Sequence, residues 1–510
     1  MNAGEGDPLE VRRLMAGDPH RPGYHYLPAD GQLQDIDGGL YWRGAYHMLY
    51  LRHPDFFREG GHPPGHWAHA STKDLVHWVD HPYALKPEPG SYDEHGVWSG
   101  GAIVADGVAT VVYTGKPYDG TYQDVPQHKP EVQCIATSTD EHLETWTKHP
   151  ANPVIADAPE GLDLTAFRDP HLWREDDGWR MLVGSGIRGS GGSVLLYRSK
   201  DFVEWEYLGQ MLTDSTAQTG WAWEVPDFFP LGDKWVLTLN PIVNEGEAGA
   251  IYYIGEYDGR RFTPERSGLL DSGWIYRAPE SFWAPDGRRL VFAWLFEERS
   301  MEARARAGWS GTASVPRELA LDEDGGLRTT PVPELESLRG DHDHAGALPL
   351  SPAQGAWRSE VEGPQVEIGA EFERGGADAV ELRFLSAPDG SEVTAVRYDW
   401  RTHELTLDTT RSSLNTADGV GRYRQVAGLG GHEGLAAALT EQPFSLAEGE
   451  NLSLRVFVDR SIVEVFANER SCLTARVYPT RQDSVGVSVA AEGGQAGLVS
   501  ADVWAMASIW

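Results

Sequence analysis

The chain has few cysteines and no long apolar segment. Its only cysteines among 510 residues, Cys134 and Cys472, cannot form a disulfide framework or a cysteine-based zinc site. The N-terminal stretch "MNAGEGDPLEVRRLMAGDPHRPGYH" lacks an apolar core of signal-peptide length, and no apolar run is long enough to span a bilayer. We therefore expect a cytoplasmic protein with reduced cysteines, although a secreted chain that had lost a leader would read the same way.

Basic residues are also scarce. Lys and Arg number 43 against 77 Asp and Glu, which gives a net charge of −34 at pH 7. A surface this acidic repels phosphate backbones and anionic lipids, so binding to nucleic acid or to a membrane is disfavoured. A neutral small-molecule or oligomeric substrate fits better. The oligomeric state stays open.

Aromatic residues, in contrast, are abundant, with 19 Trp and 19 Tyr. Runs such as "GLYWRGAYHMLYL", "GAIVADGVATVVYTG" and "KWVLTLNP" are rich in β-branched and aromatic residues and are bounded by turn formers, which predicts short strands. A chain of this length favours two or more domains. Repeated strand pairs up to about residue 330 favour a β-propeller, but the repeats are too dissimilar to give a number of blades.

The last third of the chain shows a different organisation. A Pro-, Gly- and Asp-rich stretch over residues 329–357 predicts an inter-domain connection with a short helix at "PELESLR". Beyond it, alternating apolar positions such as Leu454, Val456 and Val458 predict half-buried strands and hence a β-sandwich. The segment "LRVFVDRSIVEVF" predicts a structural hairpin that turns at residues 459–461.

Three acids in the first domain have unusual settings. Asp35 lies in "GQLQDIDGGLYW", Asp169 in "FRDPHLW" and Glu224 in "WAWEVPDFFPL", each where a strand starts or ends. Taken singly, each also suits an ordinary turn or salt bridge. We expect apolar neighbours to raise the pKa of Glu224, whereas a polar turn keeps Asp35 ionised. A protonated acid opposite an ionised carboxylate is the pair that a glycosidase needs.

Tryptophans supply apolar faces on which sugar rings stack. We expect only two or three of the tryptophans near these motifs to contact a ligand and the others to belong to the core. The candidates are Trp67, Trp98, Trp221, Trp223, Trp274 and Trp283.

Taken together and in this order, the motifs resemble those of glycoside hydrolase family 32, which comprises invertases, levanases, inulinases and related fructosyltransferases. "YHYLPADGQLQDIDG" is similar to the family's "YHFTPPKGWMNDPNG", "HWAHASTKDLVHW" to "WGHAVSTDLVHW", and "WEVPDFFPLGDKWVL" to "WECPDFFPLDGKWVL". "VWSGGAIV", "FRDP", "RAPESF" and "GWSGTASVPRELAL" also match. The similarity runs from about residue 24 to the C-terminus.

The resemblance implies an all-β fold, with a five-bladed β-propeller at residues 24–335, a linker at residues 336–356 and a β-sandwich at residues 357–510. It also implies a retaining hydrolase that cleaves β-fructofuranosyl linkages through a covalent fructosyl-enzyme, with neither a metal nor an organic cofactor. Its substrate is a fructose-containing saccharide.

The resemblance further assigns roles to single residues. It places the nucleophile on Asp35, a contact with fructose hydroxyls on Asp169 and the general acid/base on Glu224, while Asp37 with Gly38 shapes the turn. The residues expected to bind substrate are Gln34, Trp67, Trp98, Ser99, Arg168, Arg277 and Glu280.

The frame around the catalytic residues departs from the family pattern. Leu51 replaces the usual Gln, Arg277 the usual Tyr and Glu280 the usual Gln. Further departures are Gln32, Gln34, Ile36, Asp37 and Val225. We interpret them as retained chemistry with altered substrate recognition, which leaves sucrose, levan-type, inulin-type, anhydride and modified fructosyl substrates open.

Other functions fit the same motifs. A fructosyltransferase would pass the fructosyl group to a sugar hydroxyl instead of water, and product analysis distinguishes the two. A carbohydrate-binding protein on this scaffold would bind sugar without turnover. An inverting pentosidase of similar shape would release a product of inverted anomeric configuration.

Overall fold

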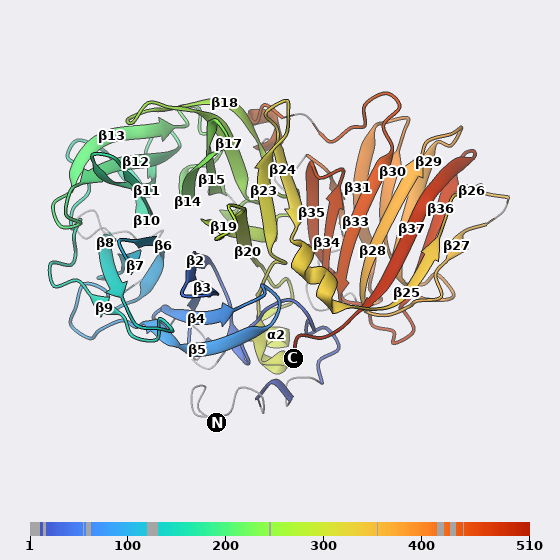
Figure 1. Ribbon diagram of the computed structural model, residues 1–510, viewed down its shortest axis with the longest axis horizontal. Helices are drawn as coiled ribbons and strands as arrows, with labels where there is room; N and C mark the ends of the chain where they lie inside the picture. Colours follow the sequence, from blue (N-terminus) through green and yellow to red (C-terminus); the bar gives the residue numbers. More distant parts are fainter. Residues whose placement is uncertain are drawn as a thin grey trace.

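The computed structural model describes residues 11–13, 17–54, 56–57, 63–119, 131–243, 246–353, 355–415, 423–428, 435–441 and 443–510. The described chain is mostly β-structure, as the sequence predicts. In Figure 1 an N-terminal part built of several sheets lies beside a C-terminal part in which two sheets face each other. Within the described residues, no helix combines the length and apolar character needed to cross a membrane.

Five antiparallel sheets follow one another along the described N-terminal part. The first contains β2 (Ile36–Trp42), β3 (Ala45–Arg52), β4 (His66–Thr72) and β5 (Trp78–Leu85). The second contains β6 (Val97–Ala105), β7 (Val108–Gly115), β8 (Val132–Ser138) and β9 (Thr147–Lys148). The third contains β10 (Leu164–Glu175), β11 (Gly178–Ile187), β12 (Gly192–Ser199) and β13 (Glu206–Thr213). The fourth contains β14 (Ala222–Leu231), β15 (Lys234–Val243), β16 (Gly246–Glu247), β17 (Ile251–Tyr257) and β18 (Phe262–Leu269). The fifth contains β19 (Tyr276–Trp283), β20 (Arg289–Leu295), β22 (Thr312–Ala313), β23 (Arg317–Leu321) and β24 (Leu327–Pro331).

The first long strand of each sheet lies at the centre of this part (Figure 1). β2 packs beside β6, β6 beside β10, β10 beside β14 and β14 beside β19, and β19 packs beside β2 again. These five strands, called the inner strands below, therefore surround a common axis. Their side chains come from sheets that are distant in sequence, so residues from five different motifs can meet at one place.

Every inner strand carries a β-bulge near its start. The register shifts between Ile36 and Gly38, Trp98 and Gly100, Arg168 and Pro170, Glu224 and Asp227, and Arg277 and Glu280. A bulge turns side chains away from the regular alternation of a strand, and bulges are common next to active sites. The predicted catalytic acids flank or occupy these bulges.

The first and fifth sheets are joined by a short parallel pair. β1 (Gly31–Gln32) pairs with β21 (Trp309–Ser310), which follows helix α2 (Met301–Ala307). Gly311, whose φ is 73°, comes so close that a Cβ there would lie 2.1 Å from the carbonyl oxygen of Leu33. Only glycine permits this approach. The segment that leads into Asp35 is thus fixed to the end of the domain.

The C-terminal part consists of two facing sheets, as expected for a sandwich. One contains β25 (Arg339–Ala345), β26 (Leu348–Leu350), β28 (Gln365–Glu373), β33 (Leu452–Asp459), β34 (Ile462–Ala467), β35 (Ser471–Arg476) and β37 (Ala496–Met506). The other contains β27 (Trp357–Arg358), β29 (Ala379–Ser386), β30 (Val393–Asp399), β31 (Glu404–Arg411), β32 (Arg424–Val426) and β36 (Gly486–Glu492). A one-turn helix, α3 (Leu435–Ala438), follows β32. Leu454, Val456 and Val458 belong to the shared core, as their alternation predicts.

The stretch predicted as a linker contains regular structure. The short helix expected at "PELESLR" is the 3₁₀-helix η2 (Pro333–Leu338). Residues 339–350, inside the predicted linker at 336–356, form β25 and β26, and both pair with β37. The composition of these residues resembles that of a loop because edge strands often carry charged residues, which discourage pairing with other chains.

The predicted hairpin joins the two parts of the protein. At its turn the Asp459 carboxylate accepts hydrogen bonds from the backbone N–H groups of Gly23, Tyr24 and His25, at 2.7, 2.8 and 2.9 Å. In β34 the Glu464 carboxylate accepts from the buried guanidinium group of Arg317, at 2.5 Å. Both acids are fully buried, so the hairpin is structural, and the contacts that it supplies lie between domains.

Candidate active site

Asp35 lies immediately before β2 and is held through its backbone by β3. Its carbonyl oxygen accepts a 2.8 Å hydrogen bond from the N–H of Leu51, whose own carbonyl accepts from the N–H of Gln34 at 2.9 Å. These backbone bonds do not depend on the side chain at position 51, so the Leu51 replacement leaves the position of Asp35 unchanged. The half-buried Asp35 side chain accepts a 2.8 Å hydrogen bond from Ser99 Oγ.

Asp169 occupies the bulge of β10 and has a φ of 59°, which is uncommon for a residue other than glycine. Its N–H donates to Thr114 Oγ1 at 2.8 Å, and its Oδ2 accepts from the N–H of Val225 at 3.1 Å. Burial raises the pKa of Asp169 well above its usual range, and the charges of Glu224 and Asp35 add to the effect, while Arg168 opposes it. The three predicted catalytic acids are therefore electrostatic neighbours.

Glu224 in β14 pairs with Arg168 in β10. Arg168 Nε donates to Glu224 Oε1 at 2.8 Å, and a terminal guanidinium nitrogen contacts the same oxygen. The Glu224 side chain retains 14% of its exposure, whereas that of Arg168 retains 3%. Burial lowers the pKa of Arg168, but Glu224, Glu131 and Asp169 outweigh that effect and raise it. The surroundings of Glu224 thus contain a buried cation besides the predicted apolar neighbours.

Hydrogen bonds link the chain segments that carry the three acids. Ser99 donates to Asp35, and the carbonyl oxygen of Ser99 accepts from Thr114 Oγ1 at 2.9 Å. Thr114 accepts from the Asp169 N–H, and the Asp169 carboxylate accepts from the N–H of Val225, which follows Glu224. Three motifs that are separated in sequence by more than 50 residues thus meet at one end of the inner strands. Thr114 was not predicted, because nothing in "VVYTG" distinguishes it from an ordinary strand residue.

The two tryptophans predicted to bind substrate have different environments. Trp98, in β6, is half-buried, and the ammonium group of Lys116 lies 4.7 Å from the centre of its ring. Trp67, in β4, is fully buried, and its indole N–H donates to the carbonyl oxygen of Trp98 at 3.1 Å. A fully buried ring has no free face for a sugar. Trp67 instead supports Trp98, which corrects the prediction for Trp67.

Arg277, which replaces the usual Tyr, lies against an aromatic cluster. The centre of its guanidinium group is 4.9 Å from the ring centre of Trp274 and 4.7 Å from that of Phe296. Its Nε also donates to the carbonyl oxygen of Trp274 at 3.1 Å, and 8% of the residue is exposed. The side chain is consequently positioned before any ligand arrives.

Asp37 and Glu280 lie deeper among the inner strands. Asp37 was predicted to shape a turn, but it is fully buried, and neither carboxylate oxygen forms a hydrogen bond to a described residue. Burial raises the pKa of Asp37 well above its usual range, as does the nearby charge of Asp35. Glu280, 3% exposed, was predicted to bind substrate. Burial and the charge of Asp227 raise the pKa of Glu280 to about 7.

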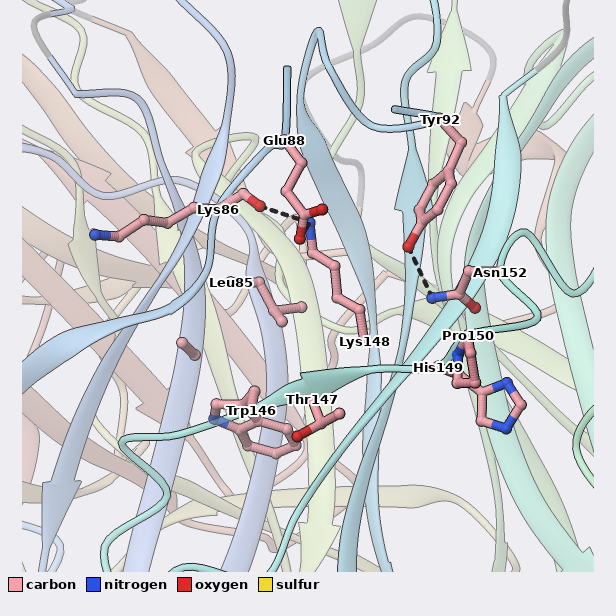
Figure 2. A pocket seen from close by; sticks show the side chains of 11 residues that line it. Leu85, Lys86, Glu88, Tyr92, Trp146, Thr147, Lys148, His149, Pro150 and Asn152 are labelled. Atoms are coloured by element: carbon pink, nitrogen blue, oxygen red, sulfur yellow. Dashed lines mark hydrogen bonds and ion pairs between the residues drawn. The ribbon is translucent and has the colours of Figure 1, made fainter. Parts of the chain in front are cut away.

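A separate cavity of about 580 Å³ opens at the edge of the first and second sheets (Figure 2). In it the ammonium group of Lys148 lies 3.2 Å from Glu88 and 2.7 Å from the carbonyl oxygen of Lys86. Across the cavity, Asn152 donates to the hydroxyl of Tyr92 at 3.1 Å. None of the predicted catalytic or substrate-binding residues lines this cavity, so it is distinct from the site around Asp35.

Comparison with known proteins identifies the family. The Glycosyl hydrolases family 32 N-terminal domain matches residues 25–331, and the Glycosyl hydrolases family 32 C terminal domain matches residues 334–505. The chain belongs to glycosyl hydrolase family 32. Family membership confirms the resemblance predicted from the motifs, and with it the prediction of a β-fructofuranosidase-type glycoside hydrolase.

Individual family 32 proteins resemble the chain over nearly its whole length. A sucrose-6-phosphate hydrolase of Escherichia coli is 33% identical over 96% of this chain and 95% of its own length. A levanase of Bacillus subtilis is also 33% identical, over 97% of this chain and 71% of its own length. The crystal structure of fructan 1-exohydrolase IIa from Cichorium intybus superposes with a TM-score of 0.82 at 24% identity, covering 96% of this chain and 98% of its own. The last similarity establishes the fold.

Proposed function

We propose that this protein is a retaining β-fructofuranosidase whose site lies at one end of a five-bladed β-propeller. The blades are the five N-terminal sheets, and their inner strands line the axis. The propeller extends over residues 24–335, and the sandwich begins at the first strand that pairs with β37, close to residue 339. The observation that carries the proposal is the set of hydrogen bonds that links the segments carrying Asp35, Asp169 and Glu224.

Asp35 acts as the nucleophile. A carboxylate oxygen attacks the anomeric carbon of the fructosyl unit, and the glycosidic bond breaks as the covalent fructosyl-enzyme forms. The hydrogen bond from Ser99 Oγ orients this carboxylate, and the backbone bond to Leu51 keeps it at the end of the strand. Asp35 is also accessible enough for the reaction, because it is only half-buried.

Glu224 acts as the general acid and then as the general base. It protonates the departing oxygen, and it later removes a proton from the water that releases fructose from Asp35. Arg168 fixes the Glu224 carboxyl group and compensates its charge after proton transfer. The buried Asp169 is restrained on two sides by Thr114 and Val225, so it can contact sugar hydroxyls with a fixed geometry.

The substrate is a fructoside with a terminal β-fructofuranosyl unit. Relatives named sucrose-6-phosphate hydrolase and levanase make sucrose, sucrose 6-phosphate and levan-type oligosaccharides the first compounds to test. Trp98 is half-buried, and Arg277, which departs from the family pattern, is 8% exposed. They are the residues that we expect to distinguish among these substrates.

The test combines product analysis with two variants. Asp35→Asn and Glu224→Gln should each lower kcat by about 10³-fold or more while leaving the fold unchanged, as circular dichroism would show. Proton NMR of the first product should show the anomeric configuration of the substrate. An inverted product, or normal turnover by either variant, would contradict the mechanism. Oligosaccharides longer than the substrate would show transfer instead of hydrolysis.

A further inference from the structure

Three buried residues converge near the axis, beyond the catalytic acids along the inner strands. His171 lies two positions after Asp169 in β10, while Asp227 in β14 and Glu280 in β19 end the bulges of their strands. His171 Nδ1 lies 3.5 Å from Asp227 Oδ1 and 3.7 Å from Glu280 Oε1. Two carboxylates and one imidazole nitrogen therefore face a single point.

The imidazole ring shows which of its nitrogen atoms is available. His171 Nε2 lies 3.1 Å from the carbonyl oxygen of Phe228, which can only accept, so Nε2 carries a proton and donates it. In the neutral ring Nδ1 then has a free lone pair. Nδ1 is buried, and its nearest carboxylate oxygens lie beyond ordinary hydrogen-bond distance. A lone pair that faces two carboxylates is repelled by them unless a proton or a metal ion lies between.

The spacing suits a cation better than a hydrogen bond. Separations of 3.5 and 3.7 Å exceed those of ordinary hydrogen bonds to nitrogen. Two ligands bonded to one ion at about 2.1 Å, with near-tetrahedral angles, are themselves about 3.4 Å apart. The hydrogen bond from Nε2 to a backbone carbonyl is also the usual support for a metal-ligating histidine.

The neighbouring groups leave room and hold the carboxylates. Ser281 donates its N–H to Asp227 Oδ2 at 2.9 Å and to Glu280 Oε2 at 3.2 Å, which directs the opposite oxygens towards His171. Gly101 of β6 borders the same space. A Cβ there would lie 3.1 Å from Glu280 Oε1 and 3.5 Å from His171 Nδ1, and also 3.5 Å from the carbonyl oxygen of Pro170. Glycine thus leaves one side of the cluster open.

Negative charge exceeds positive charge around this cluster. Arg289 donates to Asp227 Oδ1 at 3.1 Å and supplies one positive charge. Asp227 and Glu280 together place two carboxyl groups near this one guanidinium group. Buried carboxylates are expensive unless a cation or hydrogen bonds compensate them.

A cavity adjoins the cluster at His171. A space of about 510 Å³ is lined by residues of all five inner strands, including His171, Ser281 and Arg289. Trp173 and Trp283 line it too, and Trp283 is 44% exposed, so the cavity opens to solvent on its side. None of the three catalytic acids lines this cavity.

We propose that His171, Asp227 and Glu280 bind one divalent cation of the Zn²⁺ or Mn²⁺ class near the axis of the inner strands. One imidazole nitrogen and two carboxylate oxygens form a donor set that such ions accept. The ion joins three adjacent inner strands beneath the acids, so it stabilises the frame of the site without taking part in the reaction. The family resemblance implied no metal, and Glu280, which replaces the usual Gln, supplies the second carboxylate. The inference does not depend on the proposed reaction.

The experiment uses the full chain, stripped with a chelator and then titrated with Zn²⁺, Mn²⁺ or Ca²⁺ separately. Calorimetry should show one tightly bound Zn²⁺ or Mn²⁺ per chain, and the melting temperature should rise with that ion. Glu280→Gln keeps the side-chain shape but removes a charged ligand, so affinity should fall by about 10-fold or more. His171→Gln should have a similar effect.

A second group can act as an internal control. His342, His344 and Asp502 also lie within metal-ligand distance of one another, but the two histidines are exposed. His342→Gln should leave the tight binding unchanged. X-ray absorption of the wild-type protein with one Zn²⁺ should show one imidazole ligand rather than two, a readout that needs no variant. The proposal fails if no ion binds, if two imidazoles ligate the ion, or if His342→Gln alone abolishes binding.

Discussion

Arg168 Nε lies 2.8 Å from Glu224 Oε1, so a buried guanidinium group on one inner strand holds the proposed general acid on the next. A positive charge at this distance stabilises the ionised form of a carboxyl group. Because the proposed general acid must be protonated to react, we expect Arg168 to limit the pH range of activity at its alkaline end.

Replacing this arginine tests the relationship. Arg168→Gln should lower kcat/KM by about 10²-fold and move the alkaline limb of its pH profile to higher pH, because the protonated acid then persists further. Steady-state kinetics across a pH series measures both effects. Arg180→Gln, in β11, removes another buried arginine that pairs with Glu175 and should leave the limbs in place. Superimposable profiles for Arg168→Gln and the wild type would contradict the assignment.

Ser99 offers a smaller, more local perturbation. Ser99→Ala removes the 2.8 Å hydrogen bond to Asp35 Oδ2, and a single hydrogen bond to a charged group contributes about 1.5 kcal/mol or somewhat more. We expect kcat/KM to fall by about 10-fold or more, measured on the best substrate. Ser193→Ala removes a buried serine hydroxyl that bonds to Thr213 in the third sheet, and it should leave catalysis unchanged. An equal loss in both variants would point to a general effect on folding.

The contact between domains should dominate the stability of the protein. Glu464→Gln removes one of the two buried carboxylates that bond to Arg317, the other being Asp271, and should destabilise the protein by up to about 3–5 kcal/mol. Thermal denaturation should show a clear decrease in melting temperature. Asp483→Asn breaks the exposed pair with Arg481 and should leave the melting temperature nearly unchanged. Similar decreases for the two variants would show that the buried pair has no special importance.

Histidines in the first sheet should make the fold sensitive to acid. His47 Nδ1 lies 2.8 Å from His69 Nε2, and burial lowers the pKa of His47 to about 4. Between the unfolded value of 6.5 and about 4, the unfolded chain binds a proton that the folded chain does not, so stability falls as pH falls through this range. The loss at low pH amounts to about 3 kcal/mol for His47 alone.

The check is a comparison of melting temperatures at about pH 7 and about pH 5, on either side of the ordinary histidine pKa. His47→Gln should show a smaller decrease between the two conditions than the wild type. His403→Gln, at an exposed position between β30 and β31, should behave like the wild type. An unchanged decrease in His47→Gln would mean that other groups determine the response to acid.

Sequence reasoning identified the strands, the order of the two domains and the acids that meet at the site, because these depend on local patterns and ordered motifs. Burial was harder to predict. The composition around Trp67 gives no sign that its side chain is fully buried. Residues 339–350 look like a loop, yet they form edge strands because β37 provides backbone partners.

The cluster of His171, Asp227 and Glu280 was also hard to predict from the sequence. These residues lie in three separate motifs, and within its own motif each fits an ordinary structural role. Their relationship arises only when three bulged strands surround one axis, and that geometry depends on tertiary packing. Asp37 illustrates the point within a single turn, because its exposed-looking sequence context conceals a fully buried carboxyl group.

The pairing of β1 with β21 has a consequence for protein synthesis. Gly31 and Gln32 leave the ribosome early, but Trp309 and Ser310, their partners, are made almost 280 residues later. The hydrogen-bond partner of Gly23, Tyr24 and His25, Asp459, is synthesised later still. The nascent chain therefore cannot seat Asp35 in its final position until Trp309 and Ser310 have been made, and activity should appear only after Asp459 has also been translated.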